Sequence, residues 1–181
     1  MIVYSILNFK GGTGKSSLTE NLADALRRTN KKVKVLVIDA DRQSNSGATL
    51  LAGSTTSPTL TQVLKGEAPL YDAIKQAREN LYVVPSDGDL DTASGYIISH
   101  RAAYYTLRKA LKPLQDISIV LIDHAGAYTP VMEACLLASD GCSFPVNWSL
   151  MQHRDFSACL RNLVKPSSIM RWRTKALFLI T

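Results

Sequence analysis

Short apolar runs alternate along the chain with segments whose apolar residues recur at the spacing of a helix. The runs predict strands at residues 2–7, 33–38, 81–84, 117–122, 141–146 and 176–180. The helical spacing predicts helices at residues 16–29, 59–64, 70–77, 102–111, 131–138 and 150–164. Gly66 and Pro69 mark a break between two short helices, and Pro85 stops the third strand.

Strands that alternate with helices form βαβ units, which build a parallel sheet. The predicted strands are apolar throughout, as is typical of strands buried on both faces. We therefore predict an α/β fold: a doubly wound, mainly parallel sheet with helices on both faces. The chain has no repeat or low-complexity tract, and its nearest approach to a linker is the segment 52–58. We expect residues 1–181 to be one domain, truncated at its C-terminus because the chain stops directly after a predicted strand.

A glycine-rich segment joins the first predicted strand to the first helix and reads Lys10-Gly11-Gly12-Thr13-Gly14-Lys15-Ser16. Glycines let the backbone turn tightly and point its N–H groups at phosphate oxygens, and the helix N-terminus adds a positive partial charge. In such a phosphate loop Lys15 holds the β- and γ-phosphates of a nucleotide, and the Ser16 hydroxyl binds Mg²⁺. The sequence therefore predicts a site for Mg²⁺ and a nucleoside triphosphate.

Position 9 is Phe9 where the usual phosphate loop has glycine, and two adjacent glycines follow Lys10 instead. This variation resembles the deviant Walker A motif of the ParA/MinD family, Lys-Gly-Gly-x-Gly-Lys-Ser/Thr. The resemblance implies that the nucleotide is ATP and that Lys10 reaches across a homodimer interface to the partner's nucleotide. The nucleotide-binding residues that it implies are Lys10, Gly11, Gly12, Thr13, Gly14, Lys15, Ser16 and Ser17.

The second predicted strand leads into the segment Asp39-Ala40-Asp41-Arg42-Gln43-Ser44-Asn45. Carboxylates at the C-terminal ends of strands face the crevice where ligands bind in open α/β sheets. The segment is similar to the family's Asp-x-Asp-Pro-Gln-x-Asn switch, which implies that Asp41 orients or deprotonates the attacking water and that Asp39 supports the Mg²⁺ shell. The catalytic residues are then Lys10, Lys15 and Asp41. Arg42 replaces the family's proline, and we favour an exposed arginine over one that acts at the nucleotide or the dimer face.

Residues 119–123 form an apolar strand that ends in an acid, the pattern of a Walker B motif. Such a strand delivers one carboxylate, here that of Asp123, to the water shell of Mg²⁺. The metal-binding residues implied are Ser16, Asp39 and Asp123. The chain departs from the family directly after this aspartate, where it reads His124-Ala125-Gly126-Ala127. We favour a packed or solvent-facing His124 over a catalytic base.

Basic residues are concentrated at the end of the chain. The formal net charge is +6, and no acid follows Asp155. The bases beyond that point are Arg161, Lys165, Arg171, Arg173 and Lys175. A basic stretch of this kind can bind the phosphate backbone of DNA without reading its sequence. The alternative, weighed equally from charge alone, is a solvated helix face followed by a basic loop.

The composition indicates in which cellular compartment the protein is expected. The chain is 46% hydrophobic and 20% charged, as is ordinary for a soluble globular protein, and no apolar run is long enough to cross a membrane. The N-terminus does not read as a signal peptide, so we expect a cytoplasmic protein. Cys135, Cys142 and Cys159 lack the paired spacing of a zinc site or disulfide framework and are expected to be buried, inert thiols.

The resemblance covers essentially the whole chain and implies an Mg-ATP-dependent switch that forms a homodimer and binds DNA non-specifically. A ParB-type adaptor protein would stimulate its slow hydrolysis, in plasmid or chromosome partition at the nucleoid. An alternative is a MinD-type ATPase at a membrane surface, which needs a C-terminal amphipathic helix that the sequence does not show. A metal-cluster carrier of the same superfamily would need paired cysteines. A binding module without catalysis is disfavoured because Lys15, Ser16, Asp41 and Asp123 are all present.

Overall fold

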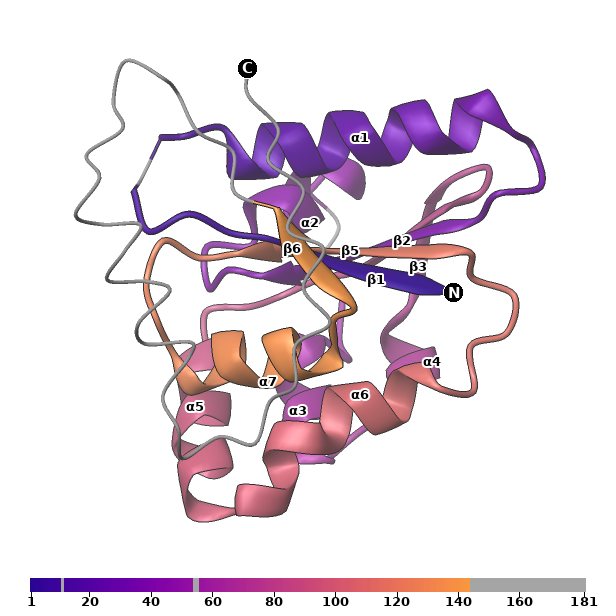
Figure 1. Cartoon of the computed structure of the whole chain (residues 1–181). Helices are drawn as coiled ribbons and strands as arrows, with labels where there is room; N and C mark the ends of the chain where they lie inside the picture. Colours follow the sequence, from indigo (N-terminus) through magenta and orange to yellow (C-terminus); the bar gives the residue numbers. More distant parts are fainter. Residues whose placement is uncertain (11, 54–55, 144–181) are drawn as a thin grey trace.

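A computed structural model describes residues 1–10, 12–53 and 56–143 of the chain (Figure 1). Its core is a 6-stranded sheet in the order β3-β4-β2-β5-β1-β6. The strands are β1 (Ile2–Ile6), β2 (Val35–Ala40), β3 (Lys75–Arg78), β4 (Leu81–Val84), β5 (Ile119–His124) and β6 (Gly141–Ser143). Every pairing is parallel except that of β3 with β4. The predicted α/β fold with a doubly wound, mainly parallel sheet is confirmed.

Helices cover both faces of this sheet (Figure 1). On one face lie α1 (Lys15–Thr29) and α2 (Asn45–Leu50). On the other lie α3 (Leu60–Lys65), α4 (Leu70–Ala73), α5 (Leu90–Ser99), the 3₁₀ helix η1 (Arg101–Tyr105), α6 (Thr106–Leu111) and α7 (Pro130–Ala138). Alternate residues of β2 enter the two cores, since Leu36 and Ile38 pack on the α7 side whereas Val35 and Val37 pack on the α1 side. Strands β2 and β5 are therefore buried on both faces.

The structure corrects the prediction of a helix at residues 70–77. Helix α4 ends at Ala73, and Lys75–Arg78 form the antiparallel edge strand β3 instead. Asn80 adopts a left-handed backbone with φ 60°, which lets the chain turn back into β4. The segment 75–78 contributes only Ala77 to the apolar core, so pairing with β4 decides its conformation over local helix propensity.

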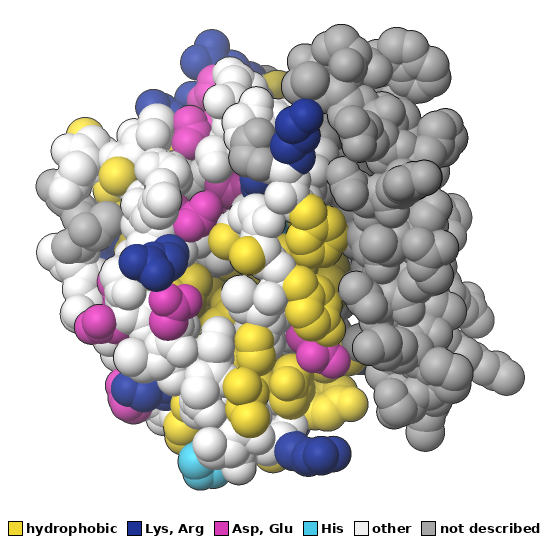
Figure 2. Space-filling model, turned by 90° about the vertical axis from the view of Figure 1, so that its left-hand side faces the viewer, with side chains coloured by type: hydrophobic (Ala, Val, Ile, Leu, Met, Phe, Trp, Pro, Cys, Tyr) yellow, Lys and Arg dark blue, Asp and Glu magenta, His cyan; other side chains and the backbone are white. Residues whose placement is uncertain are grey.

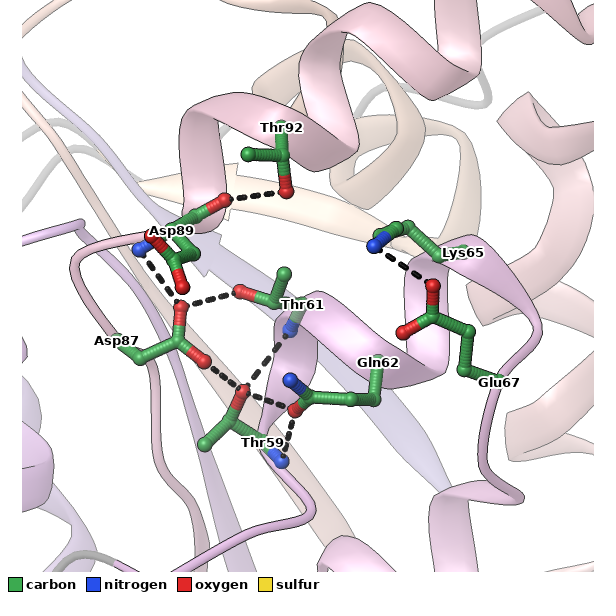
Figure 3. Close-up of polar contacts among 8 residues, drawn as sticks. All are labelled: Thr59, Thr61, Gln62, Lys65, Glu67, Asp87, Asp89 and Thr92. Carbon is green, nitrogen blue, oxygen red and sulfur yellow. Dashed lines mark hydrogen bonds and ion pairs between the residues drawn. The ribbon is translucent and has the colours of Figure 1, made fainter.

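Two helices were missed. Helix α2 begins at the last residue of the switch segment, and α5 lies between the third predicted strand and the helix predicted at 102–111, where no element was predicted. The loop before α5 is fixed by Asp87, whose carboxylate accepts hydrogen bonds from the hydroxyls of Thr59 and Thr61 and from the N–H of Asp89 (Figure 3). The same Thr59 caps α3 in a capping box with Gln62. The helix predicted at 150–164 and the strand predicted at 176–180 lie outside the described residues.

Candidate nucleotide-binding site

The glycine-rich loop lies at the carboxyl edge of the sheet, between β1 and α1 (Figure 1). Gly12 and Gly14 have φ values of 69° and 78°, a left-handed backbone conformation that favours glycine because it has no Cβ atom. Gly14 is the N-cap of α1 and provides no side-chain cap, and the first turn has no acid. Among the described residues, therefore, no side chain caps the first N–H groups of α1, which suits an anion at the positive end of the helix.

Two lysines frame this loop. The Nζ atom of Lys15 lies 3.5 Å from the carbonyl oxygen of Lys10, and a Cβ on Gly126 would be 3.9 Å from the same Nζ. The ammonium group thus sits between the loop and the segment that follows β5. Lys10 is exposed, while its backbone is held by Asn8 and Thr13. Of the other predicted nucleotide-binding residues, Thr13 lies in the loop, and Ser16 and Ser17 lie in the first turn of α1. Gly11 falls outside the described residues.

Parallel pairing of β2 with β5 sets Asp39 directly opposite Asp123, and both side chains are buried. Both residues belong to the strands themselves, since β2 and β5 extend to residues 40 and 124, further than predicted. The carboxylate of Asp39 accepts the N–H of Asp41 at 3.0 Å and the N–H of Gly47 at 2.7 Å. Asp123 accepts the Ser46 hydroxyl on Oδ2 at 2.7 Å, while its buried Oδ1 has no partner among the described residues.

Burial dominates the electrostatics of this pair. It raises the pKa of Asp39 to about 7, against the backbone N–H groups of Gly47 and Asp41, which lower it. Burial also raises the pKa of Asp123, while the nearby hydroxyls of Ser16 and Ser46 and the charge of Lys15 lower it. The carboxylate of Asp123, with one oxygen unpaired among the described residues, and the hydroxyl of Ser16 are donors of the kind that Mg²⁺ takes, whereas both oxygens of Asp39 already accept backbone N–H groups. Mg²⁺ commonly keeps several waters and phosphate oxygens in its shell and takes only one or two carboxylates from the protein.

The switch segment continues from β2 at the same edge. The carboxylate of Asp41 accepts the N–H of Gln43 at 3.0 Å, and its charge raises the pKa values of Asp39 and Asp123. The structure therefore brings Asp41 close to both buried acids. Arg42 is exposed, as favoured from the sequence, and pairs with Asp91 of α5 at 2.9 Å. Figure 2 views this edge and shows acidic and basic side chains side by side on it.

His124 is a packed residue. Successive strand residues point to opposite faces, so His124 faces away from the Asp123 side. Its Nε2 lies 2.8 Å from Ser5 Oγ, which in turn lies 2.8 Å from Ser139 Oγ, and Ser139 donates to the Cys135 carbonyl. Ser5 must then donate to Ser139, and His124 Nε2–H to Ser5. Burial and the charge of Lys15 lower the pKa of His124 to about 3, so this histidine is neutral.

Sequence reasoning missed Ser46, Gly47 and Ser5. The first two directly follow the segment 39–45 that was matched to the switch, and their polar, small character next to that segment was the available signal.

The predicted DNA-contacting residues lie outside the described residues: Arg161, Lys165, Arg171, Arg173 and Lys175. Cys135 and Cys142 are buried, and burial raises the pKa of the Cys135 thiol to about 12. Across the described residues, every helix falls short of the length and apolarity that a membrane crossing requires.

Comparison with known proteins adds three observations. An AAA domain family model matches residues 1–165. The chromosome partitioning protein ParA of Caulobacter vibrioides is 32% identical over 166 residues, which cover 89% of this chain and 61% of ParA. The maintenance of carboxysome distribution protein A (McdA) of Gloeothece citriformis is 32% identical over 149 residues, covering 80% of this chain and 56% of McdA.

A solved structure supports the same relation. The ATP complex of an aspartate-to-alanine variant of McdA from Cyanothece superposes with a TM-score of 0.86 at 26% identity, covering 99% of this chain and 70% of McdA. Among the sequence relatives, the chain spans less than two thirds of the length of Caulobacter ParA and of Gloeothece McdA.

Proposed function

The chain belongs to the AAA-domain family of ParA/MinD-type P-loop ATPases, and from that premise we propose that it binds and hydrolyses Mg-ATP at the carboxyl edge of its sheet. One observation carries the proposal: the open N-terminus of α1 lies beside a buried carboxylate, Asp123, that keeps one oxygen unpaired. The first feature suits a phosphate group and the second suits a divalent cation. The ATP bound to the related McdA structure supports the choice of nucleotide.

Each residue of the site has a distinct task in this proposal. The N–H groups of the loop and the Lys15 ammonium bind the phosphates, and Ser16 and Asp123 hold Mg²⁺. A cation held there would neutralise charge on the phosphate oxygens. Asp39 holds the turn that carries Asp41, because its carboxylate binds the N–H of Asp41. Asp41 orients the attacking water and accepts its proton.

We further propose that two copies of the chain dimerise around two nucleotides. Lys10 supports this arrangement, because its side chain is exposed at the rim of the loop and is free to reach a partner's nucleotide. The dimer binds DNA non-specifically through the basic residues after Asp155, and a ParB-type adaptor stimulates hydrolysis and releases it. The protein would then work in the cytoplasm on the nucleoid, in plasmid or chromosome partition.

The similarity to McdA favours a second candidate function, in which the cargo is not a plasmid or chromosome. A protein named for the maintenance of carboxysome distribution matches this chain at the same identity as ParA does. The same ATP-dependent cycle on DNA would then position a protein assembly instead of a DNA molecule. The two candidates share the site chemistry and differ only in the adaptor.

The test compares the full chain with Asp41→Ala and Lys10→Ala, each measured for ATP turnover and for size in the presence of Mg-ATP. Asp41→Ala should bind ATP, lose turnover and accumulate as a dimer. Lys10→Ala should bind ATP and stay monomeric. Wild-type turnover in Asp41→Ala would remove this residue from its role, and an ATP dimer of Lys10→Ala would remove the lysine from the interface.

A further inference from the structure

Ser46 is a buried serine in the first turn of α2, and its hydroxyl donates to Asp123 Oδ2 at 2.7 Å. The two residues are separated by 77 positions in the sequence, so this contact joins α2 to the end of β5. The next residue, Gly47, donates its backbone N–H to Asp39 Oδ2 at 2.7 Å. A single turn of α2 therefore binds both buried carboxylates of the site.

The consequence for Asp123 is an asymmetry between its two oxygens. Oδ2 is occupied by Ser46, whereas Oδ1 is buried and has no partner among the described residues. A carboxylate with one oxygen fixed cannot rotate freely about its Cβ–Cγ bond. The unpaired oxygen is thereby held in one direction, while the Ser16 hydroxyl at the start of α1 lies close to the same side chain.

We propose that Ser46 is a positioning residue, which orients Asp123 so that one oxygen alone is presented to Mg²⁺. The inference rests on the proposed function, since it concerns the metal that accompanies the nucleotide. Hydrogen-bond partners of metal ligands commonly set metal affinity, and their loss costs about 10- to 100-fold. Ser46 also ties the metal ligand to the switch, because α2 begins only four positions after Asp41.

Close packing keeps Ser46 in place. A Cβ on Gly47 would lie 2.7 Å from Ser44 Oγ and 3.2 Å from Pro85 Cβ, so a larger residue there would force Ser44 and either Pro85 or α2 to shift. Glu20 of α1 lies close to Ser46 and Thr49, and burial raises the pKa of its carboxyl group. The hydroxyl of Thr49 belongs to the same helix but makes no bond to Asp123, which makes it a matched control.

In the experiment, the full chain is first saturated with ADP and then titrated with Mn²⁺. Electron paramagnetic resonance measures the free and the bound metal. Ser46→Ala should weaken Mn²⁺ binding about tenfold or more and leave ADP affinity in EDTA unchanged. Ser46→Thr, which keeps the hydroxyl, should stay within about twofold of the wild type. Thr49→Val should bind Mn²⁺ as the wild type does, and melting curves without ligand establish that each variant is folded.

Three outcomes separate the two proposals. Wild-type Mn²⁺ affinity in Ser46→Ala overturns the positioning role and leaves the proposed function standing. Equal weakening in Ser46→Ala and Thr49→Val also overturns it, because the effect would then belong to α2 as a whole. If the wild type itself holds no Mn²⁺ with ADP, the proposed function fails, and the positioning role fails with it.

Discussion

Asp39 and Asp123 stand opposite each other on β2 and β5, yet their carboxylates are bound in different ways. Both oxygens of Asp39 accept backbone N–H groups, one from Asp41 in the switch segment and one from Gly47 in α2. A side-chain hydroxyl occupies one oxygen of Asp123 and the other is left unpaired within the described residues. We propose that the two acids therefore do separate work: Asp39, expected from the sequence to support the Mg²⁺ shell, instead holds the protein's own backbone, and Asp123 is the acid available for a cation.

The largest expected effect comes from neutralising each acid in turn. Asp123→Asn should abolish the part of the ATP-induced thermal stabilisation that depends on Mg²⁺. Asp39→Asn should retain that part but lower the free energy of unfolding by about 1–3 kcal/mol, because an amide leaves a buried N–H without an acceptor. Melting curves with ATP, in Mg²⁺ and in EDTA, measure both quantities. Loss of the Mg²⁺ effect in both variants to the same extent would contradict the division of work.

A pH series sharpens the same comparison. The folded pKa of Asp39, about 7, lies above its unfolded value, so its contribution to stability is present at acid pH and is lost as pH rises towards 7. The cost of Asp39→Asn should therefore be greater at pH 5 than at pH 8, changing by up to about 1.4 kcal/mol per pH unit. Subtracting the free energy of unfolding of Asp39→Asn from that of the wild type removes the pH-dependent contribution of His124, which both proteins share. The lowered pKa of His124 changes stability with pH in the opposite direction. A cost that stays constant between pH 5 and pH 8 would show that Asp39 is ionised throughout.

The smallest effect is expected at the surface of the switch. Arg42 and Asp91 form an ion pair in which both side chains are 63% exposed, and such pairs contribute roughly 0–1 kcal/mol. Arg42→Ala should change the free energy of unfolding by less than about 1 kcal/mol, and 1 M salt should remove the difference. Denaturant unfolding at low and high salt measures it. A larger loss that survives in salt would mean that Arg42 contributes through packing.

The fold and the phosphate loop were predictable because their signals are local. A strand buried on both faces is apolar along its whole length, as in Val35–Ala40 up to its acid, and the loop requires glycines at fixed positions. Edge strand β3 was not predictable, because its conformation depends on pairing with β4. Asp123 could be identified from its strand, whereas its bond to Ser46 depends on where α2 packs. The sequence thus indicates the groups that bind a ligand more readily than those that orient them.

The most direct test of nucleotide binding at the loop is the thermal stabilisation of the full chain by Mg-ATP, compared with that of Lys15→Ala. At a nucleotide concentration about 100 times Kd, the wild type should gain about 2.7 kcal/mol of stability, seen as a higher melting temperature. Lys15→Ala should gain nothing, because its loop no longer has the ammonium group that lies beside Gly126. An equal gain in Lys15→Ala would place the nucleotide elsewhere and contradict the account.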